Sequence, residues 1–393
     1  MPVHRMPGER GRVWADPKEL DQWRLGKPTA APSETPPRIW RRYILAGTAA
    51  VLLILLAVIV GWRSFSRPVP SAWSVEGRTL TMRNSDGAVL WRHTFDVEPV
   101  SAGSLERQPH DVRALLADFD GDGAVELLYR YSLPYAAGAP DVLYCFDADG
   151  QIRWRFKTIR TVRSAKPEEF PPPYSIRTFS PVNLGSGRQG VVVSSVQAPM
   201  YPARVALLSA EGKELAEYWH SGHLQAILTA DRNGDGRDEI YLGGVSNSYR
   251  RATLVVLDPV TMAGASREEN SDYQIQGFPA PVEIARLLFR RTRVGAEGSS
   301  DYNIVANLML QGDFLNVHIA EETDKTHPAM VYLNLNRSLH VTSASANDAL
   351  MKRHRERFSS AQPGFSLDDQ IRELVAGVDY LTPPAREFSL SGR

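Results

Sequence analysis

The chain has 393 residues, of which 43% are hydrophobic, so it is long enough for one large folded domain or two smaller ones. Its 45 Lys and Arg residues balance 45 Asp and Glu residues, which excludes a basic field over the whole molecule that would favour nucleic acid. The single cysteine, Cys145, excludes an intrachain disulfide and a metal site of the usual multi-cysteine kind.

Residues 1–42 form a basic tail, with nine Lys and Arg against five Asp and Glu, a net charge of +4. Four prolines between positions 28 and 37 make that stretch a linker. Before the linker, the tail resembles the back half of an excisionase-type winged helix. The resemblance places residues 3–5 at the exit of the recognition helix, residues 12–14 in the wing, and a short helix at 19–24 with Leu20 and Trp23 facing inward.

In that family the two helices that enter DNA lie upstream of this segment, and the chain as written has no counterpart to them. We therefore interpret residues 1–42 as a cytoplasmic basic tail, a possible winged-helix remnant, and expect no nucleic acid partner.

Residues 43–62 (Y-I-L-A-G-T-A-A-V-L-L-I-L-L-A-V-I-V-G-W) carry no charge and are almost entirely apolar. About 20 such residues span a hydrocarbon core of roughly 30 Å, which predicts a single transmembrane helix that anchors the chain in a membrane. A signal peptide is disfavoured, because the apolar run is longer than a signal-peptide core and no A-x-A cleavage site follows.

The positive charges predict the orientation of this span. Three arginines precede it (Arg38, Arg41 and Arg42) and two follow it (Arg63 and Arg67), and the rest of the basic tail adds to that bias. We expect a bacterial-type inner or plasma membrane, crossed once, with the N-terminus cytoplasmic and the C-terminal domain outside.

Two loops further along carry oxygen side chains at alternate positions. Residues 118–126 read D-F-D-G-D-G-A-V-E, and residues 231–239 read D-R-N-G-D-G-R-D-E. The predicted ligands in the two loops are Asp118, Asp120, Asp122 and Glu126, and Asp231, Asn233, Asp235 and Glu239. Carboxylate and amide oxygens at this spacing suit Ca²⁺, which takes six to eight oxygen ligands, and the intervening glycines allow the backbone to turn tightly around the ion.

An EF-hand begins in the same way but needs a bidentate Glu at its twelfth position and flanking helices. Here the twelfth positions are Tyr129 and Leu242, and short β-branched and aromatic runs flank both loops. The loops resemble instead those of the FG-GAP/VCBS repeat family, the calcium-loop β-propellers of integrin α heads and many bacterial surface proteins. Plain Asp-Gly hairpin turns are the alternative for either loop.

A second repeated feature is a strand, an acidic-Gly turn and another strand, at residues 79–91, 143–154 and 206–215. The turn glycines, Gly87, Gly150 and Gly212, are spaced 63 and 62 residues apart. A looser fourth copy is predicted at 254–264. These hairpins resemble those of quinoprotein-like propellers, and we interpret them as structural turns that hold no ion.

Hairpins and calcium-type loops alternate along the chain, with a degenerate loop at 182–190. Each unit of roughly 50–65 residues then has four strands, which predicts an all-β fold: a β-propeller of four-stranded blades, five to seven in number, following the single transmembrane helix. We assign residues 68–345 to this extracytoplasmic propeller. Residues 346–393 form a C-terminal closing segment, with helices predicted at 349–358 and 367–375.

Three other motifs give weaker evidence of function. Gly185, Gly187 and Gly190 match a dinucleotide fingerprint, but a strand rather than a helix follows them. His220 and His223 lack an identifiable third metal ligand, and we expect them to be exposed on a blade rim. No Ser/His/Asp arrangement is readable, so we expect no enzymatic activity.

The sequence thus favours a membrane-anchored, extracytoplasmic, calcium-binding β-propeller that acts as an adhesion or interaction module for a protein or glycan ligand. The FG-GAP resemblance supplies the adhesion part of this expectation. The alternative is a transmembrane sensor or regulator that couples the propeller to a cytoplasmic DNA-binding tail.

Overall fold

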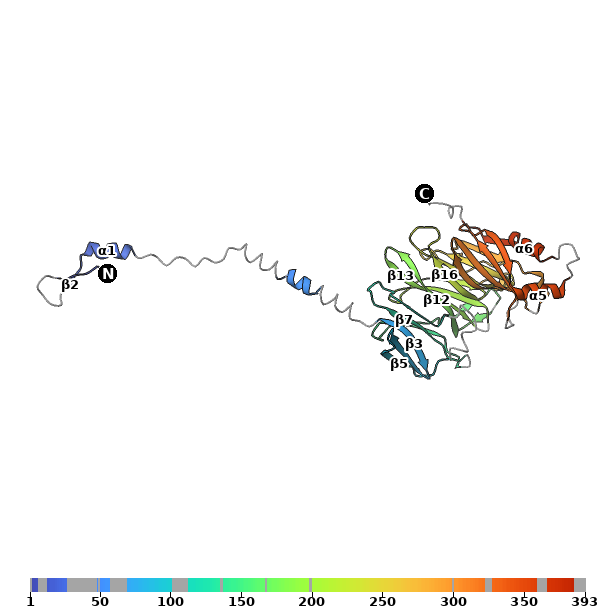
Figure 1. The fold of residues 1–393 in the computed structure, drawn as a ribbon, viewed down its shortest axis with the longest axis horizontal. Coiled ribbons are helices and arrows are strands. Elements are labelled where there is room, and N and C mark those ends of the chain that lie inside the picture. The colour runs from blue at the N-terminus through green and yellow to red at the C-terminus, as the bar shows by residue number, and fades with distance from the viewer. Residues whose placement is uncertain are drawn as a thin grey trace. The chain divides into compact units, whose positions relative to one another are not determined.

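The computed structural model describes residues 2–5, 13–26, 48, 50–56, 69–100, 112–134, 137–166, 168–197, 200–298, 300–321, 327–358 and 366–384. The chain divides into two compact units, Met1–Arg67 and Pro68–Arg393 (Figure 1).

The first unit contains a short hairpin and one helix. Strand β1 (His4–Arg5) pairs with β2 (Val13–Trp14), and helix α1 (Pro17–Leu25) follows. Asp16 caps α1 by accepting a hydrogen bond from the backbone N–H of Lys18, and proline stands at the first turn, as at many helix starts. The predicted helix at 19–24 lies within α1, in which Leu20 is half-buried and Trp23 is 40% exposed; their predicted inward orientation stays a prediction.

Most of the predicted membrane span, and the whole proline linker, lie outside the described residues. Within the span, residue 48 and residues 50–56 are helical. Among the residues that the structure describes, no helix has the length and apolarity needed to cross a membrane. The span at 43–62 stays a prediction.

The second unit consists mostly of antiparallel sheets whose strands follow one another in chain order. The first sheet has β3 (Pro70–Glu76), β4 (Thr79–Asn84) and β5 (Val89–Thr94). The second has β6 (Ala114–Ala117), β7 (Glu126–Tyr131), β8 (Val142–Phe146) and β9 (Ile152–Phe156). The third has β12 (Tyr174–Gly185), β13 (Arg188–Gln197), β14 (Pro202–Ser209) and β15 (Glu214–Ser221).

The fourth sheet has β16 (Leu224–Ala230), β17 (Glu239–Ser246), β18 (Arg251–Leu257) and β19 (Ala285–Phe289), and β24 (Val378–Thr382) joins it beside β19. The fifth has β20 (Ile304–Gln311), β21 (Phe314–Ala320), β22 (Met330–Leu335) and β23 (Val341–Ala346). A small separate hairpin pairs β10 (Val162–Arg163) with β11 (Glu169–Phe170). The prediction of a mostly β fold with repeated four-stranded sheets is confirmed at this level.

Short helices complete the unit. They are η2 (Ser271–Tyr273), α4 (Arg293–Ala296), α5 (Asp348–Arg357) and α6 (Leu367–Ala376). The two predicted C-terminal helices correspond to α5 and α6, capped by the side chains of Asn347 and Ser366. Both helices contact the fifth sheet.

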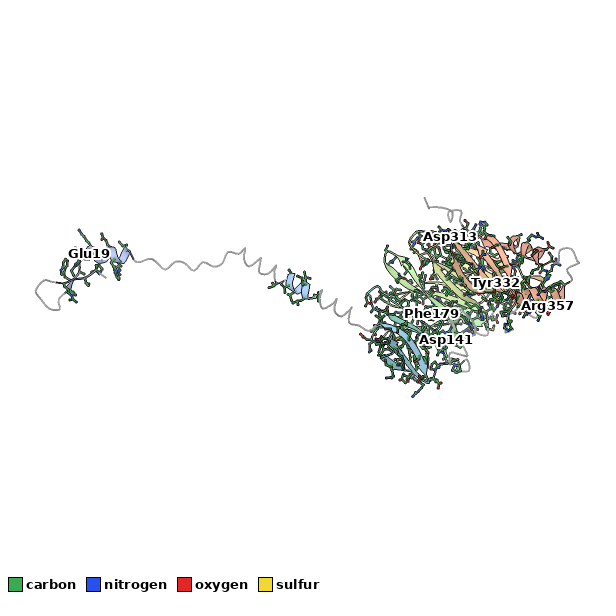
Figure 2. The ribbon with its side chains drawn as sticks, in the orientation of Figure 1. Glu19, Asp141, Phe179, Asp313, Tyr332 and Arg357 are labelled. Carbon is green, nitrogen blue, oxygen red and sulfur yellow. The ribbon has the colours of Figure 1, made fainter. Side chains whose placement is uncertain are left out.

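Apolar side chains hold consecutive sheets together. One cluster joins the first and second sheets through residues such as Met82 and Tyr129. Others join the second to the third and the third to the fourth; Phe179 on β12 belongs to the former and is almost fully buried (Figure 2). A fully buried aliphatic or aromatic side chain stabilises by about 1.5–3 kcal/mol, so this stacking supplies much of the stability.

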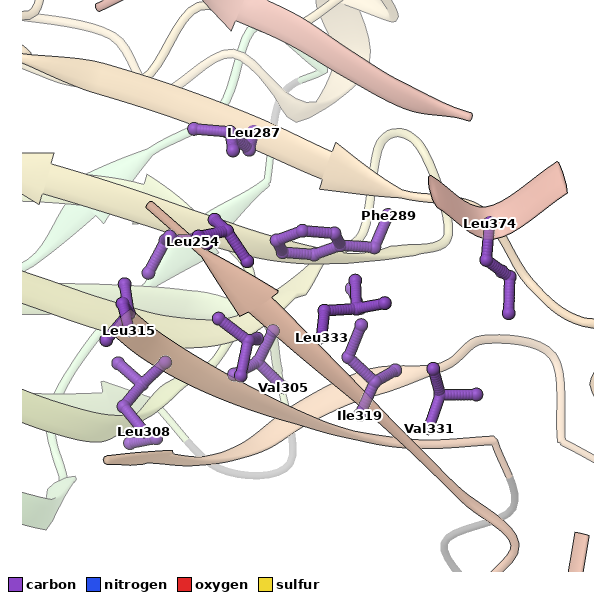
Figure 3. Packing of buried hydrophobic residues seen from close by; sticks show 14 of the residues in the cluster. Leu254, Leu287, Phe289, Val305, Leu308, Leu315, Ile319, Val331, Leu333 and Leu374 are labelled. Carbon is purple, nitrogen blue, oxygen red and sulfur yellow. The ribbon is translucent and has the colours of Figure 1, made fainter. Parts of the chain in front are cut away.

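Figure 3 shows the largest of these clusters. Leu254 and Phe289 of the fourth sheet face Val305 and Leu333 of the fifth, and Leu374 of α6 lies at one end. Among the described residues, none of the apolar clusters joins the first sheet to the fifth.

The repeated acidic-Gly hairpins form as predicted. They are β4–β5, β8–β9 and β14–β15, and their turn glycines all have positive φ (79°, 83° and 78°), a conformation that L side chains rarely adopt. The fourth copy at 254–264 is wrong as a hairpin, because the strand that pairs next with β18 is β19, which begins only at Ala285.

Candidate metal centre

The first acidic loop connects β6 to β7 and folds around the carboxylate of Asp118. One carboxylate oxygen accepts a hydrogen bond from the backbone N–H of Gly121 (2.7 Å) and the other from Gly123 (2.9 Å). Both glycines have positive φ, 78° and 84°, so the sequence of the loop permits this wrapping. Asp118 therefore sits at the centre of a tight turn, as the alternating-oxygen pattern predicts.

Glu126 closes the loop from the first position of β7. Its side chain is 1% exposed, and its Oε2 accepts a hydrogen bond from the backbone N–H of Phe119 (2.8 Å). Burial raises the pKa of Glu126 above its usual value, and the charge of Asp120 adds to the effect. One oxygen each of Asp118, Asp120 and Glu126 lie within 4.8 Å of one another.

The second acidic loop, between β16 and β17, repeats this arrangement. Asp231 accepts hydrogen bonds from the backbone N–H groups of Gly234 (2.7 Å) and Gly236 (2.9 Å). Glu239 begins β17, is buried, and accepts from the N–H of Arg232 (3.0 Å). One oxygen each of Asp231, Asp235 and Glu239 also lie within 4.8 Å of one another.

Burial raises the pKa of Glu239 further, to about 7. Besides the backbone N–H of Arg232, the hydroxyl group of Tyr241 donates a hydrogen bond to Glu239 at 3.1 Å. Both donors are neutral. The charged form of this carboxylate is therefore poorly compensated in the part of the chain that the structure describes.

The remaining predicted ligands serve local turns. Asp122 accepts a hydrogen bond from the backbone N–H of Ala124 (2.7 Å), and Asn233 accepts from Asp235 (2.8 Å). Both side chains lie in their loops as expected, but Asp122 does not belong to the group of three carboxylate oxygens in its loop. Such Asx contacts shape a loop whether or not an ion is bound.

The donor set suits Ca²⁺. Oxygens bound to one Ca²⁺ at about 2.4 Å lie at most about 4.8 Å apart, which matches the spacing of the three carboxylate oxygens in each loop. Asp118, Asp120 and Glu126 would hold an ion in the first loop, and Asp231, Asp235 and Glu239 in the second. The twelfth positions, Tyr129 and Leu242, are buried in strands, which agrees with the rejection of an EF-hand.

A basic residue that the sequence pattern does not predict, Arg153, also lies beside the first loop. The guanidinium group of Arg153, on β9, lies 2.6 Å from Asp120 and 3.4 Å from Glu126. Arg153 is 27 positions beyond Glu126 in the sequence, and only the pairing of β7, β8 and β9 brings it close.

The second loop also lies at a junction of sheets. Asp238 and Asn183 exchange two hydrogen bonds (2.8 and 2.9 Å), which tie the loop to the end of β12 in the third sheet. On the other side, the guanidinium group of Arg232 donates to the carbonyl oxygen of Asp313 (2.9 Å), in the β20–β21 turn of the fifth sheet. The loop therefore connects its own sheet to both neighbours.

The glycine motif agrees with its prediction, whereas the two histidines do not. The G-x-G-x-x-G stretch is a strand–turn–strand segment, so its rejection as a nucleotide site stands. The expectation that His220 and His223 are exposed is wrong. His220 is fully buried and contacts the carbonyl of Val245 at 3.3 Å, and His223 contacts that of Met200 at 2.8 Å.

No family model matches the chain, and no curated protein is similar to it in sequence. Solved structures with some likeness include the C-terminal domain of PilY1 from Pseudomonas aeruginosa (14% identity, TM-score 0.38), which covers 67% of this chain and 56% of that one. A protein of unknown function from Bacteroides caccae (11%, TM-score 0.26) covers 71% of this chain and 95% of its own.

BBS1N in complex with ARL6DN (10% identity, TM-score 0.28) covers 72% of this chain and 84% of that one. The chain thus spans little more than half of the PilY1 domain.

Proposed function

We propose that this chain is a membrane-anchored protein whose β unit is displayed outside the cytosol, is stabilised by Ca²⁺, and binds a protein or glycan ligand. The observation that carries the proposal is the matched pair of acidic loops. In each, an aspartate held by two backbone N–H groups and a buried glutamate bring carboxylate oxygens to the spacing that Ca²⁺ requires.

The predicted span at 43–62 supports the anchored part of the proposal, and the excess of arginine before it supports an extracytoplasmic β unit. Low-affinity calcium loops fill where Ca²⁺ is plentiful, which is outside the cytosol. The two arguments are independent and agree on the same side of the membrane.

The stacked meander sheets would form blades of a β-propeller on this proposal, with ligands contacting the loops between sheets. Ca²⁺ would act by stiffening this surface, since the second loop is hydrogen-bonded to both neighbouring sheets. A rigid loop surface loses less conformational entropy when a ligand binds.

The test is thermal unfolding of the full-length chain in detergent, in excess calcium and in chelator. At 100 times the dissociation constant, one bound ion stabilises by about 2.7 kcal/mol, which raises Tm by roughly 5 °C. The double variant Asp118→Ala, Asp231→Ala should lose this response. Asp86→Ala, in an acidic turn with too few alternating oxygens to hold an ion, should keep it. An equal Tm for the wild type in both buffers would refute the calcium part.

A second experiment tests whether the ligand is a glycan and whether its binding depends on Ca²⁺. The purified chain should bind spots on a glycan array in calcium and lose them in chelator. Array binding that persists in chelator would separate ligand binding from the calcium loops.

A further inference from the structure

We infer that Arg153 supplies the positive charge of the first acidic loop, so that the two loops are not equivalent and only the second is open to calcium. This inference rests on the proposed function and assigns different roles to its two loops.

Arg153 bridges the two carboxylates that an ion in the first loop would have to join. Its guanidinium group is 2.6 Å from Oδ2 of Asp120 and 3.4 Å from Oε1 of Glu126. The two acidic side chains are 17% and 1% exposed, and that of Arg153 is 28% exposed, so the contacts are partly shielded from water. A divalent ion bound to the same oxygens would face this cation at close range, and the repulsion would weaken its binding.

A backbone irregularity aims Arg153 at the loop. In the β8–β9 pair, Cys145 lies opposite Trp154 and Phe146 lies opposite Ile152, which leaves Arg153 without a partner across the ladder. Such a β-bulge bends the strand and redirects the side chain of the extra residue.

The same bulge follows the turn glycine in two other hairpins, and β22–β23 has one that leaves Thr342 unpaired, three positions after the positive-φ turn residue Leu339. In β4–β5 the unpaired residue is Leu90, and in β14–β15 it is Leu215, each three positions after its turn glycine, as Arg153 is after Gly150. Neither of those sheets has a loop with alternating carboxylates: the first sheet begins at β3, and the third has N-L-G-S-G-R between β12 and β13. Arginine thus replaces leucine at the repeated position in the one of these three sheets that has an acidic loop.

The second loop has no such counterpart. Strands β18 and β19 pair without a register shift, so they contain no bulged residue. The neighbouring Arg237 pairs with Asp235, but both side chains are 37% exposed and the pair lies within the loop itself. Among the described residues, no ion pair is found at Glu239, whose two hydrogen-bond donors are both neutral.

The inference is tested by calorimetric titration of the full-length chain in detergent with CaCl₂ alone. We expect one site per chain in the wild type and two in Arg153→Leu, which installs the residue found at the two equivalent bulges. Asp231→Ala should remove the wild-type site and leave one site in the Arg153→Leu background. The matched control is Arg155→Leu, two positions along β9, whose guanidinium group lies 5.1 Å from the ring centroid of Tyr144; it should bind as the wild type does.

The outcomes separate this inference from the proposed function. Two sites in the wild type, or one site in both the wild type and Arg153→Leu, would overturn the inference alone. No site in either chain would overturn the proposed function. Circular dichroism establishes that each variant is folded, and Arg153→Gln, which keeps a polar side chain, serves the same test if the leucine variant does not fold.

Discussion

The indole ring of Trp154 lies directly against Gly212, in the hairpin turn of the next sheet. A Cβ atom on Gly212 would come within 2.4 Å of Cγ of Trp154, and the indole N–H donates to the carbonyl oxygen of Ala210 (2.8 Å). Trp91 lies in the same way against Gly150, one sheet earlier. In the first two hairpins the tryptophan therefore packs on the turn of the following hairpin, which gives the repeat of Gly and Trp in the sequence a structural reason.

The contact between Trp154 and Gly212 predicts that a side chain at position 212 destabilises the fold. Gly212→Ala should destabilise the second unit by roughly 2–5 kcal/mol, because it adds a Cβ at positive φ, at about 1–2 kcal/mol, and overpacks the tryptophan, at about 1–3 kcal/mol. Gly87→Ala is the matched control, since Gly87 has the same φ within a degree and no atom near its absent Cβ. It should cost only about 1–2 kcal/mol. Urea unfolding measures both, and equal losses would contradict the packing argument.

The junction at the second acidic loop predicts unequal roles for two arginines of that loop. Arg232 is 7% exposed, donates to Asp313 in the next sheet and lies over the ring of Tyr241, whereas the side chain of Arg237 is 37% exposed and pairs with the exposed Asp235. Arg232→Gln should destabilise by about 1–3 kcal/mol through loss of a buried hydrogen bond, and Arg237→Gln by less than about 1 kcal/mol. Denaturant titration in chelator is the measurement, and a larger loss for Arg237→Gln would contradict this account.

Glu321 predicts a pH dependence of stability. Its side chain is fully buried beside Thr292 and Asn303, and burial raises its pKa from 4.5 to about 7. Because the folded state binds this proton more tightly than the unfolded state does, the free energy of unfolding should fall as pH rises from 4.5 towards 7, by at most about 1.4 kcal/mol per pH unit.

Glu321→Gln, which cannot titrate, should reduce this slope. It should also lower stability at low pH, because its amide group can accept only one of the two hydrogen bonds. The comparison is urea unfolding at pH 5 and pH 7 for both chains. An unchanged slope in the variant would show that other groups, such as the buried Asp141, dominate.

Local patterns in the sequence predicted local structure well. The hairpins around Gly87, Gly150 and Gly212 and helices α5 and α6 follow from turn glycines, strand alternation and helix caps within a few residues. The candidate ligands likewise come from one short loop each, so their proximity could be predicted from spacing alone.

Contacts between distant segments could not be predicted in this way. Strand β24 pairs with β19 although 88 residues separate the two strands, and no sequence pattern in either strand predicts that pairing. The fourth hairpin was predicted from its turn signal, but the chain after β18 makes a long connection instead. Arg153 contacts Asp120 from a bulge two strands away, so the residues around Asp120 do not predict this ion pair. His220 is buried by the packing of neighbouring sheets, so the residues next to it in the sequence do not predict its burial.

The predicted membrane orientation can be tested by cysteine labelling, because the chain's single native cysteine is buried. Cys145 is fully buried, and burial raises the pKa of its thiol to about 12, so it should react slowly with maleimides. A cysteine introduced elsewhere is then labelled selectively in cells that express the protein. We expect a membrane-impermeant maleimide to label Ser85→Cys, in the exposed turn after β4, and not Ser33→Cys, in the basic tail. The excess of arginine before residues 43–62 should keep that tail in the cytosol, and labelling of Ser33→Cys in intact cells would reverse or remove the predicted orientation.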